Sequence, residues 1–455
     1  MTHTIEIQRP EVADRGLDEV VKRLTPEQIE KTINQVLTKE CAARLETYVE
    51  TCMRCGLCAN ACHFCLSHDG EPSWSPVGKV RNTMWEILRR KGKVSPQFMK
   101  QAARIAYTEC NVCRRCSMYC PFGIDIAYLL LTVRRICSLL RLVPQYLQDT
   151  VNSHAVTMNQ MWLQTDEWID TLMWQEEEAA TEVKGARIPL DVEGVNFMYS
   201  VIGPEPKILA QLIGYFAKIM AVVNYNCRKR GEPELTWTMP SVDGWDNSNM
   251  AMYSGDFETM GRVERLHWDA AMRLRAKRVV MGECGHAFRG AVYDGPKWVG
   301  WHHTPIPMTH AIDFYYEIIS TGKIGIKKKF EKPITVQDPC NVVRGRGLGP
   351  KLREIMRATC TDFRDVHPKY EHNYCCAAGG GVINCGPPWT RTRVEGNRVK
   401  ADQLRETGAE IVVTPCHNCH SGIEDIIKGY KLGMHTKFFS EILVQVMDVP
   451  EEIRA

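Results

Sequence analysis

The chain has no hydrophobic run long enough to cross a bilayer. A membrane-spanning helix needs about 20 predominantly apolar residues, and the best candidate, 126–143, contains Arg134, Arg135 and Arg141. The first residues, Met-Thr-His-Thr-Ile-Glu, lack the basic region and apolar core of a secretory signal. The sequence therefore predicts a cytoplasmic protein whose contact with a membrane runs through a partner.

An excess of charge of either sign is also absent. Lys and Arg number 57 and Asp and Glu number 54 among 455 residues. Nucleic-acid-binding domains usually carry a pronounced basic excess, so no nucleic-acid partner is expected. Hydrophobic residues make up 44% of the chain, enough to bury sizeable cores, and the length predicts about three domains.

Cysteine, by contrast, is abundant, with 20 residues. Many of them fall in C-x-x-C spacings, which indicate metal ligands in a reducing compartment rather than disulfides. The cysteines that stand alone are predicted to be small buried hydrophobic residues; they are Cys41, Cys137, Cys227, Cys360 and Cys385. Cys65, three residues after a motif, is predicted to be a bystander.

Two cysteine runs have the spacing of two-cluster ferredoxins: Cys52-x-x-Cys55-x-x-Cys58-x-x-x-Cys62 and Cys110-x-x-Cys113-x-x-Cys116-x-x-x-Cys120-Pro121. In that arrangement the fourth cysteine of each run ligates the other cluster. The predicted ligands are Cys52, Cys55, Cys58 and Cys120 for cubane cluster I, and Cys110, Cys113, Cys116 and Cys62 for cubane cluster II. Zinc is disfavoured because zinc sites seldom use a triple C-x-x-C-x-x-C run.

Hydrophobic periodicity predicts helices over 17–48, 80–90, 96–107 and most of 125–230. The 47 residues between Cys62 and Cys110 are too many for a compact small ferredoxin and fit a helical one. Beyond a polar loop at 241–256, helices alternate with short apolar strands, which predicts parallel α/β layers. The predicted helices there are 257–276 and 397–407, and the predicted strands are 278–281, 334–336 and 411–413.

A third group of cysteines comprises Cys340, the adjacent pair Cys375-Cys376, Cys416 and Cys419. An adjacent pair is too crowded for a tetrahedral zinc site and suits a cubane poorly, so spacing alone indicates a multi-iron thiolate site. The surrounding residues 373–381 and 414–420 resemble the CCG module of heterodisulfide-reductase-type proteins. That resemblance implies that the five thiolates bind a noncubane [4Fe-4S] cluster, for a total of three [4Fe-4S] clusters. Glycines 379–381 would be either a flexible turn or a close approach of backbone N–H groups to the cluster.

A dicluster ferredoxin followed by a CCG module resembles the HdrD-type iron–sulfur subunit. The blocks at 282–287 and 416–422 are similar to those of the DsrK, TmcB and HmcF group of sulfate-reducer membrane complexes. The resemblance implies a place on the cytoplasmic face of the inner membrane. The implied partners are an integral-membrane cytochrome b or quinone-linked subunit, indirectly a multihaem cytochrome c, and a small sulfur-carrier protein of the DsrC type. One departure is Ala377-Ala378, which replaces the first glycine expected after the pair.

The expected fold class is multidomain α+β, with a helical dicluster ferredoxin domain before an α/β CCG module of two pseudo-repeated halves. The expected boundaries are 1–45 for an N-terminal helical segment, 46–140 for the ferredoxin domain, 141–240 for a helical linker, 241–330 for a degenerate first half and 331–455 for the half with the noncubane cluster.

A faint internal repeat supports the two halves. Aligning Val279-Val280 with Val412-Val413 places Glu283 opposite Cys416 and His286 opposite Cys419. Glu283 and His286 would then flank the pocket between the halves and could deliver protons to sulfur, or they could simply cap the strand end. Cys284 is a candidate reactive thiol and His417 a candidate proton or hydrogen-bond donor to cluster thiolates.

Three functions are compatible with these features. The first is an enzyme that passes electrons through two cubane clusters to a noncubane cluster, where a disulfide, trisulfide or persulfide is reduced. The second is a relay subunit with no substrate of its own, between a cytochrome c chain and a cytoplasmic carrier. The third, an iron–sulfur subunit of a soluble dehydrogenase, is disfavoured by the Cys-His-Asn-Cys-His and Gly-Glu-Cys-Gly-His blocks.

Overall fold

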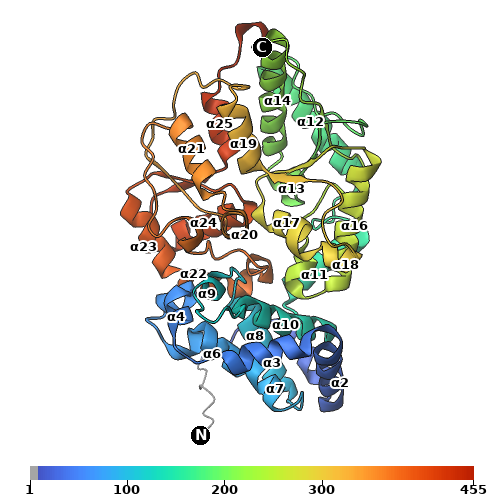
Figure 1. Cartoon of the computed structure of the whole chain (residues 1–455), viewed down its shortest axis with the longest axis vertical. Coiled ribbons are helices and arrows are strands. Elements are labelled where there is room, and N and C mark those ends of the chain that lie inside the picture. Colours follow the sequence, from blue (N-terminus) through green and yellow to red (C-terminus); the bar gives the residue numbers. More distant parts are fainter. Residues whose placement is uncertain (1–8) are drawn as a thin grey trace.

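The computed structural model describes residues 9–455, without the side chains of residues 40–42. Figure 1 shows a helical domain at the N-terminal end of the elongated molecule, below two α/β halves that stand side by side. The first eight residues of the predicted N-terminal segment and the Cys41 side chain lie outside the described part. The protein is a multidomain, mixed helical and sheet structure.

The N-terminal domain is built from short helices around one long one, α10. Its elements are α1 (Arg15–Asp18), η1 (Val21–Arg23), α2 (Pro26–Val36), η2 (Leu37–Cys41), α3 (Ala42–Thr51), α4 (Leu57–Ala61), α5 (His63–Ser67), η3 (Pro72–Trp74), α6 (Pro76–Val80), η4 (Arg81–Trp85), α7 (Glu86–Arg89), α8 (Pro96–Thr108), α9 (Arg115–Met118) and α10 (Ile126–Leu139). Thr25 begins α2 with a capping box that includes Gln28. The predicted single helix over 17–48 is therefore interrupted before Thr25.

The first α/β half holds a four-stranded parallel sheet in the order β2-β1-β3-β4. Its elements are α11 (Gln145–Thr157), α12 (Thr165–Glu182), β1 (Phe197–Ser200), α13 (Pro204–Ile208), α14 (Gln211–Lys229), β2 (Trp237–Thr238), α15 (Met250–Ser254), α16 (Phe257–Arg273), β3 (Val279–Met281), α17 (Gly285–Arg289), η5 (Gly290–Asp294), α18 (Pro296–Val299), β4 (Met308–His310) and α19 (Ala311–Ser320). The predicted helical linker over 141–240 contains α11 to α14 but also two strands that the prediction did not include, β1 and β2. Both strands are too short to show a clear period.

The second half holds a three-stranded parallel sheet in the order β5-β6-β7. Its elements are β5 (Ile334–Val336), α20 (Cys340–Arg346), α21 (Gly349–Thr359), η6 (Tyr370–His372), η7 (Ile383–Cys385), η8 (Pro387–Trp389), α22 (Thr390–Glu395), α23 (Arg398–Thr407), β6 (Ile411–Val413), α24 (His417–Tyr430), β7 (His435–Lys437), α25 (Phe439–Val446) and η9 (Glu451–Ile453). The strands predicted at 278–281, 334–336 and 411–413 are confirmed as β3, β5 and β6.

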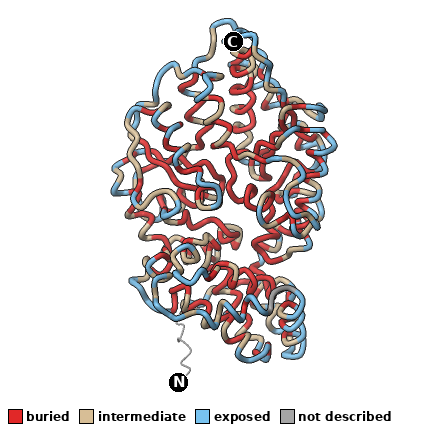
Figure 2. The backbone as a smooth tube through the Cα atoms, viewed as in Figure 1, coloured by how far each residue is buried: buried red, intermediate tan, exposed pale blue. Residues whose placement is uncertain are grey.

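One hydrophobic core runs through both sheets, and a second fills the helical domain. Phe197 and Val279 of the first sheet share the first core with Ile334 and Ile411 of the second, so the halves are not independently packed. Figure 2 shows that buried backbone is continuous through the centre of the two halves. Four of the C-terminal cysteines lie in a third, smaller cluster with residues such as Val412 and Ile423; they are Cys375, Cys376, Cys416 and Cys419.

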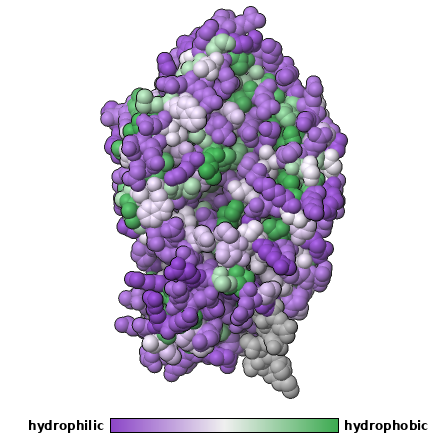
Figure 3. Space-filling model, turned by 180° about the vertical axis from the view of Figure 1, so that it is seen from behind, coloured by the Kyte–Doolittle hydropathy of each residue, from purple (hydrophilic) through white to green (hydrophobic). Residues whose placement is uncertain are grey.

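No helix among the described residues is both long and apolar enough to cross a membrane. In α10, which begins the best candidate segment of the sequence, Arg134 and Arg135 are buried inside the protein. The face in Figure 3 is mostly hydrophilic, with apolar residues in small separate groups.

Candidate iron–sulfur centres

The first centre is a cavity at the end of the helical domain. Cys52, Cys55, Cys58 and Cys120 all line it, so the fourth cysteine of the second run joins three cysteines of the first. Cys55 is exposed and the other three are partly buried. The exposed apolar side chains Met53 and Phe122 also line this cavity. The four sulfur donors around one cavity fit a four-iron cluster, whose cubane form takes one thiolate per iron.

The second centre is a smaller cavity, deeper in the protein. Cys62, Cys110, Cys113 and Cys116 line it, which is the complementary crossed set. Lys79, only 2% exposed, places its Nζ 3.9 Å from the Cys62 sulfur and donates to the Glu109 carbonyl. A buried cation beside thiolates offsets part of their negative charge.

Both cysteine runs have the same unusual backbone. Two and four residues after the first cysteine, the first run has positive φ at Arg54 (57°) and Gly56 (84°), and the second has it at Val112 (47°) and Arg114 (63°). A β-branched residue such as Val112 rarely adopts this conformation. Here it turns the Val112 N–H toward the Cys110 sulfur at 3.4 Å. The same pair of left-handed positions thus recurs in both runs, and it turns the chain within each run of cysteines.

The five C-terminal cysteines meet at the ends of the second sheet's strands. Cys340 begins α20 just after β5, and Cys416 caps α24 just after β6. Sulfur contacts join them in the order Cys340, Cys375, Cys376, Cys419, Cys416. Neighbouring thiols donate to Cys376 and Cys416 and hold the pKa of each well below its ordinary value. This sulfur-rich donor set fits a multi-iron cluster.

Charged residues that the sequence analysis did not single out hold the loop of the adjacent cysteine pair. Arg353 pairs with Asp338, two residues before Cys340, and also bonds Asp365 at 2.8 Å. Asp338 in turn accepts hydrogen bonds from the Tyr370 N–H and the Asn373 side chain, both at 2.9 Å. The motif Asp-Pro-Cys at 338–340 could have indicated such a charged partner. An aspartate next to a buried cysteine ligand is itself expected to be buried, and a buried aspartate needs a partner.

Lys400 is fully buried near the same loop and bonds the Asn373 side chain at 3.1 Å. Burial lowers its pKa to about 8. Lys400 is thus a second buried cation close to cysteine sulfur, as Lys79 is at the second centre.

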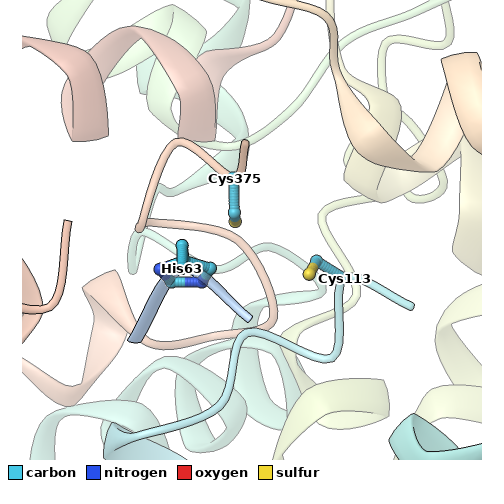
Figure 4. A group of neighbouring side chains, drawn as sticks. All are labelled: His63, Cys113 and Cys375. Carbon is cyan, nitrogen blue, oxygen red and sulfur yellow. The ribbon is translucent and has the colours of Figure 1, made fainter. Parts of the chain in front are cut away.

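The second and third centres are directly adjacent. The Cys113 and Cys375 sulfurs and a ring nitrogen of His63 lie within 4.8 Å of one another, with His63 and Cys375 buried. Figure 4 shows the three side chains converging from the helical domain and the pair loop. The Asn111 side chain joins the helical domain to the loop after the cysteine pair. It donates hydrogen bonds to the carbonyls of Ala377 (2.6 Å) and Gly379 (2.8 Å).

One of the glycines after the pair, Gly380, serves this packing. A Cβ on Gly380 would lie 2.3 Å from the Asn111 carbonyl oxygen, and Gly380 has a φ of +68°. This position is therefore glycine because the helical domain approaches the backbone closely. Neither of the two predicted roles, a flexible turn or an approach to cluster sulfides, included this contact.

The two halves are related through Cys284 and Cys416. Each cysteine lies three residues beyond its strand, caps the following helix, and has its N–H bonded at 2.6 Å to the carbonyl two residues earlier. Their sulfurs are in contact. The predicted alignment, with Glu283 opposite Cys416, is therefore wrong by one residue. Two consecutive valines in each strand gave the wrong register, and Ala287, not His286, lies opposite Cys419.

The remaining candidates divide into two pairs. His286 is buried near Cys416 and its Nδ1 bonds Asn418 at 2.7 Å, and Cys284 contacts Cys416, so both lie beside the five-cysteine group. Glu283 is directed away, accepting the N–H groups of Phe439 and Ser440 at 2.8 Å at the start of α25. His417 donates from Nδ1 to the Glu283 carbonyl at 2.9 Å and its Nε2 lies 3.3 Å from Glu205.

Burial moves the pKa values of these groups in opposite directions. It raises the pKa of Glu283 to about 7 and lowers those of His286 and His417 to about 4. Glu283 thus has a structural contact that differs from the predicted capping of its own strand end, since both carboxylate oxygens bond the N-terminus of α25.

Comparison with known proteins matches two families in the same order along the chain. Residues 48–124 match the 4Fe-4S dicluster domain, and residues 334–424 match the cysteine-rich domain termed CCG. The chain is 26% identical to the Hdr-like menaquinol oxidoreductase iron-sulfur subunit of Archaeoglobus profundus, over 82% of this chain and 74% of that protein. It is 24% identical to a subunit of the dihydromethanophenazine:CoB--CoM heterodisulfide reductase of Methanosarcina barkeri, over 85% of this chain and 91% of that protein.

Over most of its length the chain is similar to HdrD-like iron–sulfur oxidoreductase subunits. The dicluster match contains all eight cysteines that line the first two cavities, and the CCG match contains the five of the third group. Cys284 and Cys137, outside both matches, are not needed to complete any of these sets. Both domain matches therefore include the cysteines that converge in the structure.

Proposed function

We propose that this HdrD-like protein carries electrons from a membrane partner through two cubane [4Fe-4S] clusters to a noncubane [4Fe-4S] cluster, where a sulfur–sulfur bond is reduced, or formed in the reverse direction. The contact between Cys113 and Cys375 is the observation that carries the proposal. It joins the second ferredoxin centre to the third sulfur group with no other residue between the sulfurs.

At the other end of this path, the first centre is open to the surface. Cys55 is exposed, and the apolar side chains of Met53 (70% exposed), Leu57 (45%) and Phe122 (47%) surround it. Exposed apolar groups next to a redox centre favour docking of a protein partner. We assign electron exchange with a cytochrome b or quinone-linked membrane subunit to this surface. A multihaem cytochrome c would exchange electrons with that membrane subunit and not directly with this protein.

The names of two relatives support this arrangement. One is a menaquinol oxidoreductase subunit and the other belongs to a reductase of a heterodisulfide. Both names combine a lipid-soluble electron carrier with heterodisulfide-reductase chemistry. We propose a place on the cytoplasmic face of the membrane, and a disulfide or trisulfide on a small DsrC-like sulfur-carrier protein as substrate.

The residues at the third centre would position sulfur and protons. The bound clusters would supply one-electron steps, and two such steps are needed for each sulfur–sulfur bond. Cys284 and His286 lie among the cysteines and are the groups we assign to the reacting sulfur. Glu283 and His417 act as positioning residues, since Glu283 anchors α25 and His417 bonds the Glu283 backbone.

The test is anaerobic reduction of a small trisulfide by the purified subunit with an artificial electron donor. We expect reduction by the wild type, loss in Cys375→Ala, and near-normal activity in Cys227→Ala, which alters a buried cysteine far from the three centres. Reduction of cluster signals by the donor with no trisulfide turnover would instead indicate the relay function. Equal turnover in both variants would refute the proposed site.

A further inference from the structure

The first half contains a cavity of its own, of about 430 Å³. Its walls come from the last turns of α11, from α16 and from the short helix α18, which lie next to one another in Figure 1. None of the described residues that line it is a cysteine, and none also lines the first or the second centre. We call this space the α16 cavity. Its volume is within the range of roughly 300–1,000 Å³ that is usual for small-ligand pockets.

Two arginines of α16 line this cavity without a counter-charge. Arg262 donates to a hydroxyl of its own helix at 3.2 Å, and Arg265 donates to a backbone carbonyl of α18 at 3.3 Å. Neither forms an ion pair with a carboxylate in the part of the chain that the structure describes. Glu258 also lines the cavity, but it is paired with Arg135 at 2.6 Å. The cavity therefore keeps both positive charges, and no cysteine among its described lining residues offsets them.

Two buried nitrogen atoms of the lining residues have no hydrogen-bond partner within residues 9–455. They are Nδ1 of His154, which is only 4% exposed, and Nε1 of Trp298. Burial lowers the pKa of His154 and the charge of Arg262 lowers it further, so the ring is neutral at neutral pH and carries one N–H. Water satisfies an exposed arginine, but a buried nitrogen without a partner is unfavourable. These two atoms therefore distinguish the cavity from an ordinary charged surface.

We propose that the α16 cavity binds a phosphate ester, with the phosphate at Arg262 and Arg265 and the rest of the ligand against α11 and α18. The arginines and Trp298 can only donate hydrogen bonds, and the neutral imidazole can donate one, so an anion satisfies all of them. The donors come from three helices. They suit a tetrahedral phosphate better than a planar carboxylate, because phosphate oxygens accept from several directions.

The remaining walls of the α16 cavity are apolar, so the ligand carries an apolar group besides its phosphate. The apolar lining residues are Ala155, Met158, Val263, Leu266 and Val299. Such a ligand takes no part in the proposed electron path. The inference thus goes beyond the proposed function and is independent of it.

Two sources offer this chemistry, and the test separates them. One is a soluble phosphate ester, and the other is the headgroup of an anionic phospholipid in a membrane. The soluble probe is phenyl phosphate, and its neutral counterpart is phenol. The membrane probes are vesicles of phosphatidylglycerol and vesicles of phosphatidylcholine, which carry phosphate but no net charge.

Binding is measured on the full-length, iron-loaded protein under anaerobic conditions, by isothermal titration calorimetry for the soluble probes and by co-sedimentation for the vesicles. We expect phenyl phosphate to bind at least about tenfold more tightly than phenol, the effect of one charge-assisted hydrogen bond. Raising the salt concentration should reduce this preference. Sedimentation with phosphatidylglycerol alone, reversed by phenyl phosphate, identifies a lipid headgroup as the source. Sedimentation with neither vesicle identifies a soluble ester.

Arg262→Gln should remove most of the preference for phosphate. The matched control is Arg273→Gln, because Arg273 is an exposed arginine in the last turn of the same helix and does not line the cavity. Ala155→Trp should block phenyl phosphate, since the larger side chain fills the space. An unchanged iron content and an unchanged midpoint of thermal unfolding show that each variant has folded.

Equal binding of phenyl phosphate and phenol, with no preference between the two kinds of vesicle, would overturn the inference. An equal loss of binding in Arg262→Gln and Arg273→Gln would also overturn it, because only the overall charge of α16 would then matter. Both outcomes are separate from turnover, since neither substitution touches a cysteine of the three centres. A protein that binds phosphate in this way but reduces no trisulfide keeps the cavity and loses the proposed function.

Discussion

The Cys113 sulfur, on the helical domain, lies within 4.8 Å of the Cys375 sulfur, on the loop of the second half. Residues 262 positions apart in sequence thus bring two candidate cluster sites into contact. The charge of each cluster would affect the other electrostatically, because little solvent separates the two centres. Reduction of one is therefore expected to alter the spectrum of the other.

The crossed arrangement at the first cavity can be tested with Cys120→Ala. Cys120 lines the cavity of Cys52, Cys55 and Cys58, so its loss should damage that cluster and spare the one at Cys110, Cys113 and Cys116. The wild type should hold about 12 irons, from three four-iron clusters. Electron paramagnetic resonance distinguishes the two cubane signals; loss of the second signal alone would contradict the assignment.

Lys79 should raise the reduction potential of the second cluster. Lys79→Met keeps the length of the buried side chain and removes its charge, 3.9 Å from the Cys62 sulfur. Because a nearby positive charge favours the reduced cluster, we expect the midpoint potential to fall, by about 59 mV for each tenfold change in the one-electron equilibrium. The measurement is a redox titration followed by paramagnetic resonance. Lys400→Met, near the third centre, should lower the second cluster's potential by less, because Lys400 lies beside the sulfurs of the third group.

Cys284→Ala should change the spectrum of the third cluster without loss of iron. Cys284 contacts the Cys416 sulfur but lies outside the five-cysteine group. Cys137→Ala, another buried cysteine, is the control and should leave the spectrum unaltered. Loss of about four irons in Cys284→Ala would show that Cys284 is a required ligand.

Acid should destabilise the protein through buried His267. Burial lowers the pKa of His267 from 6.5 to about 4, so between these values the unfolded chain binds a proton that the folded chain does not. The free energy of unfolding therefore falls as pH decreases from 6.5 to 4, by about 1.4 kcal/mol per pH unit. His267→Gln should flatten this dependence in anaerobic urea unfolding, since a glutamine amide can still donate to the Gly244 carbonyl. His435→Gln, at an exposed histidine, is expected to behave as the wild type. If the free energy of unfolding depended on pH equally steeply in both variants, His267 would be excluded as the cause.

The apolar surface around Cys55 can be tested with Met53→Glu. Met53 is 70% exposed, so the change should not affect stability. We expect at least a roughly tenfold loss of co-purification with the membrane partner, because charge is unfavourable at the core of a protein interface. Met173→Glu, at another exposed methionine (56%), is the control and should retain the partner.

Local spacing was sufficient to predict several parts of this structure. The cysteine runs specify which sulfurs share a cavity, because ligand spacing is a property of a short segment. Strands β3, β5 and β6 are apolar and bounded by turn residues, so they are also recognisable. In contrast, β1 and β2 are short and are stabilised by neighbours far away in sequence. The contacts of Asn111, Arg134 and Lys400 depend on tertiary packing that no local pattern encodes.

Arg134 illustrates what this packing implies for the ferredoxin portion on its own. Its guanidinium is fully buried and donates to the carbonyls of Ala106 and Cys110 in the helical domain, Tyr253 in the first half and Gly380 in the second. A fragment ending before Tyr253 would lack half of these acceptors together with the packing that buries Arg134, so its guanidinium would face water. Arg134 therefore connects the ferredoxin portion to both halves, and we expect that portion to be less stable alone than within the whole polypeptide.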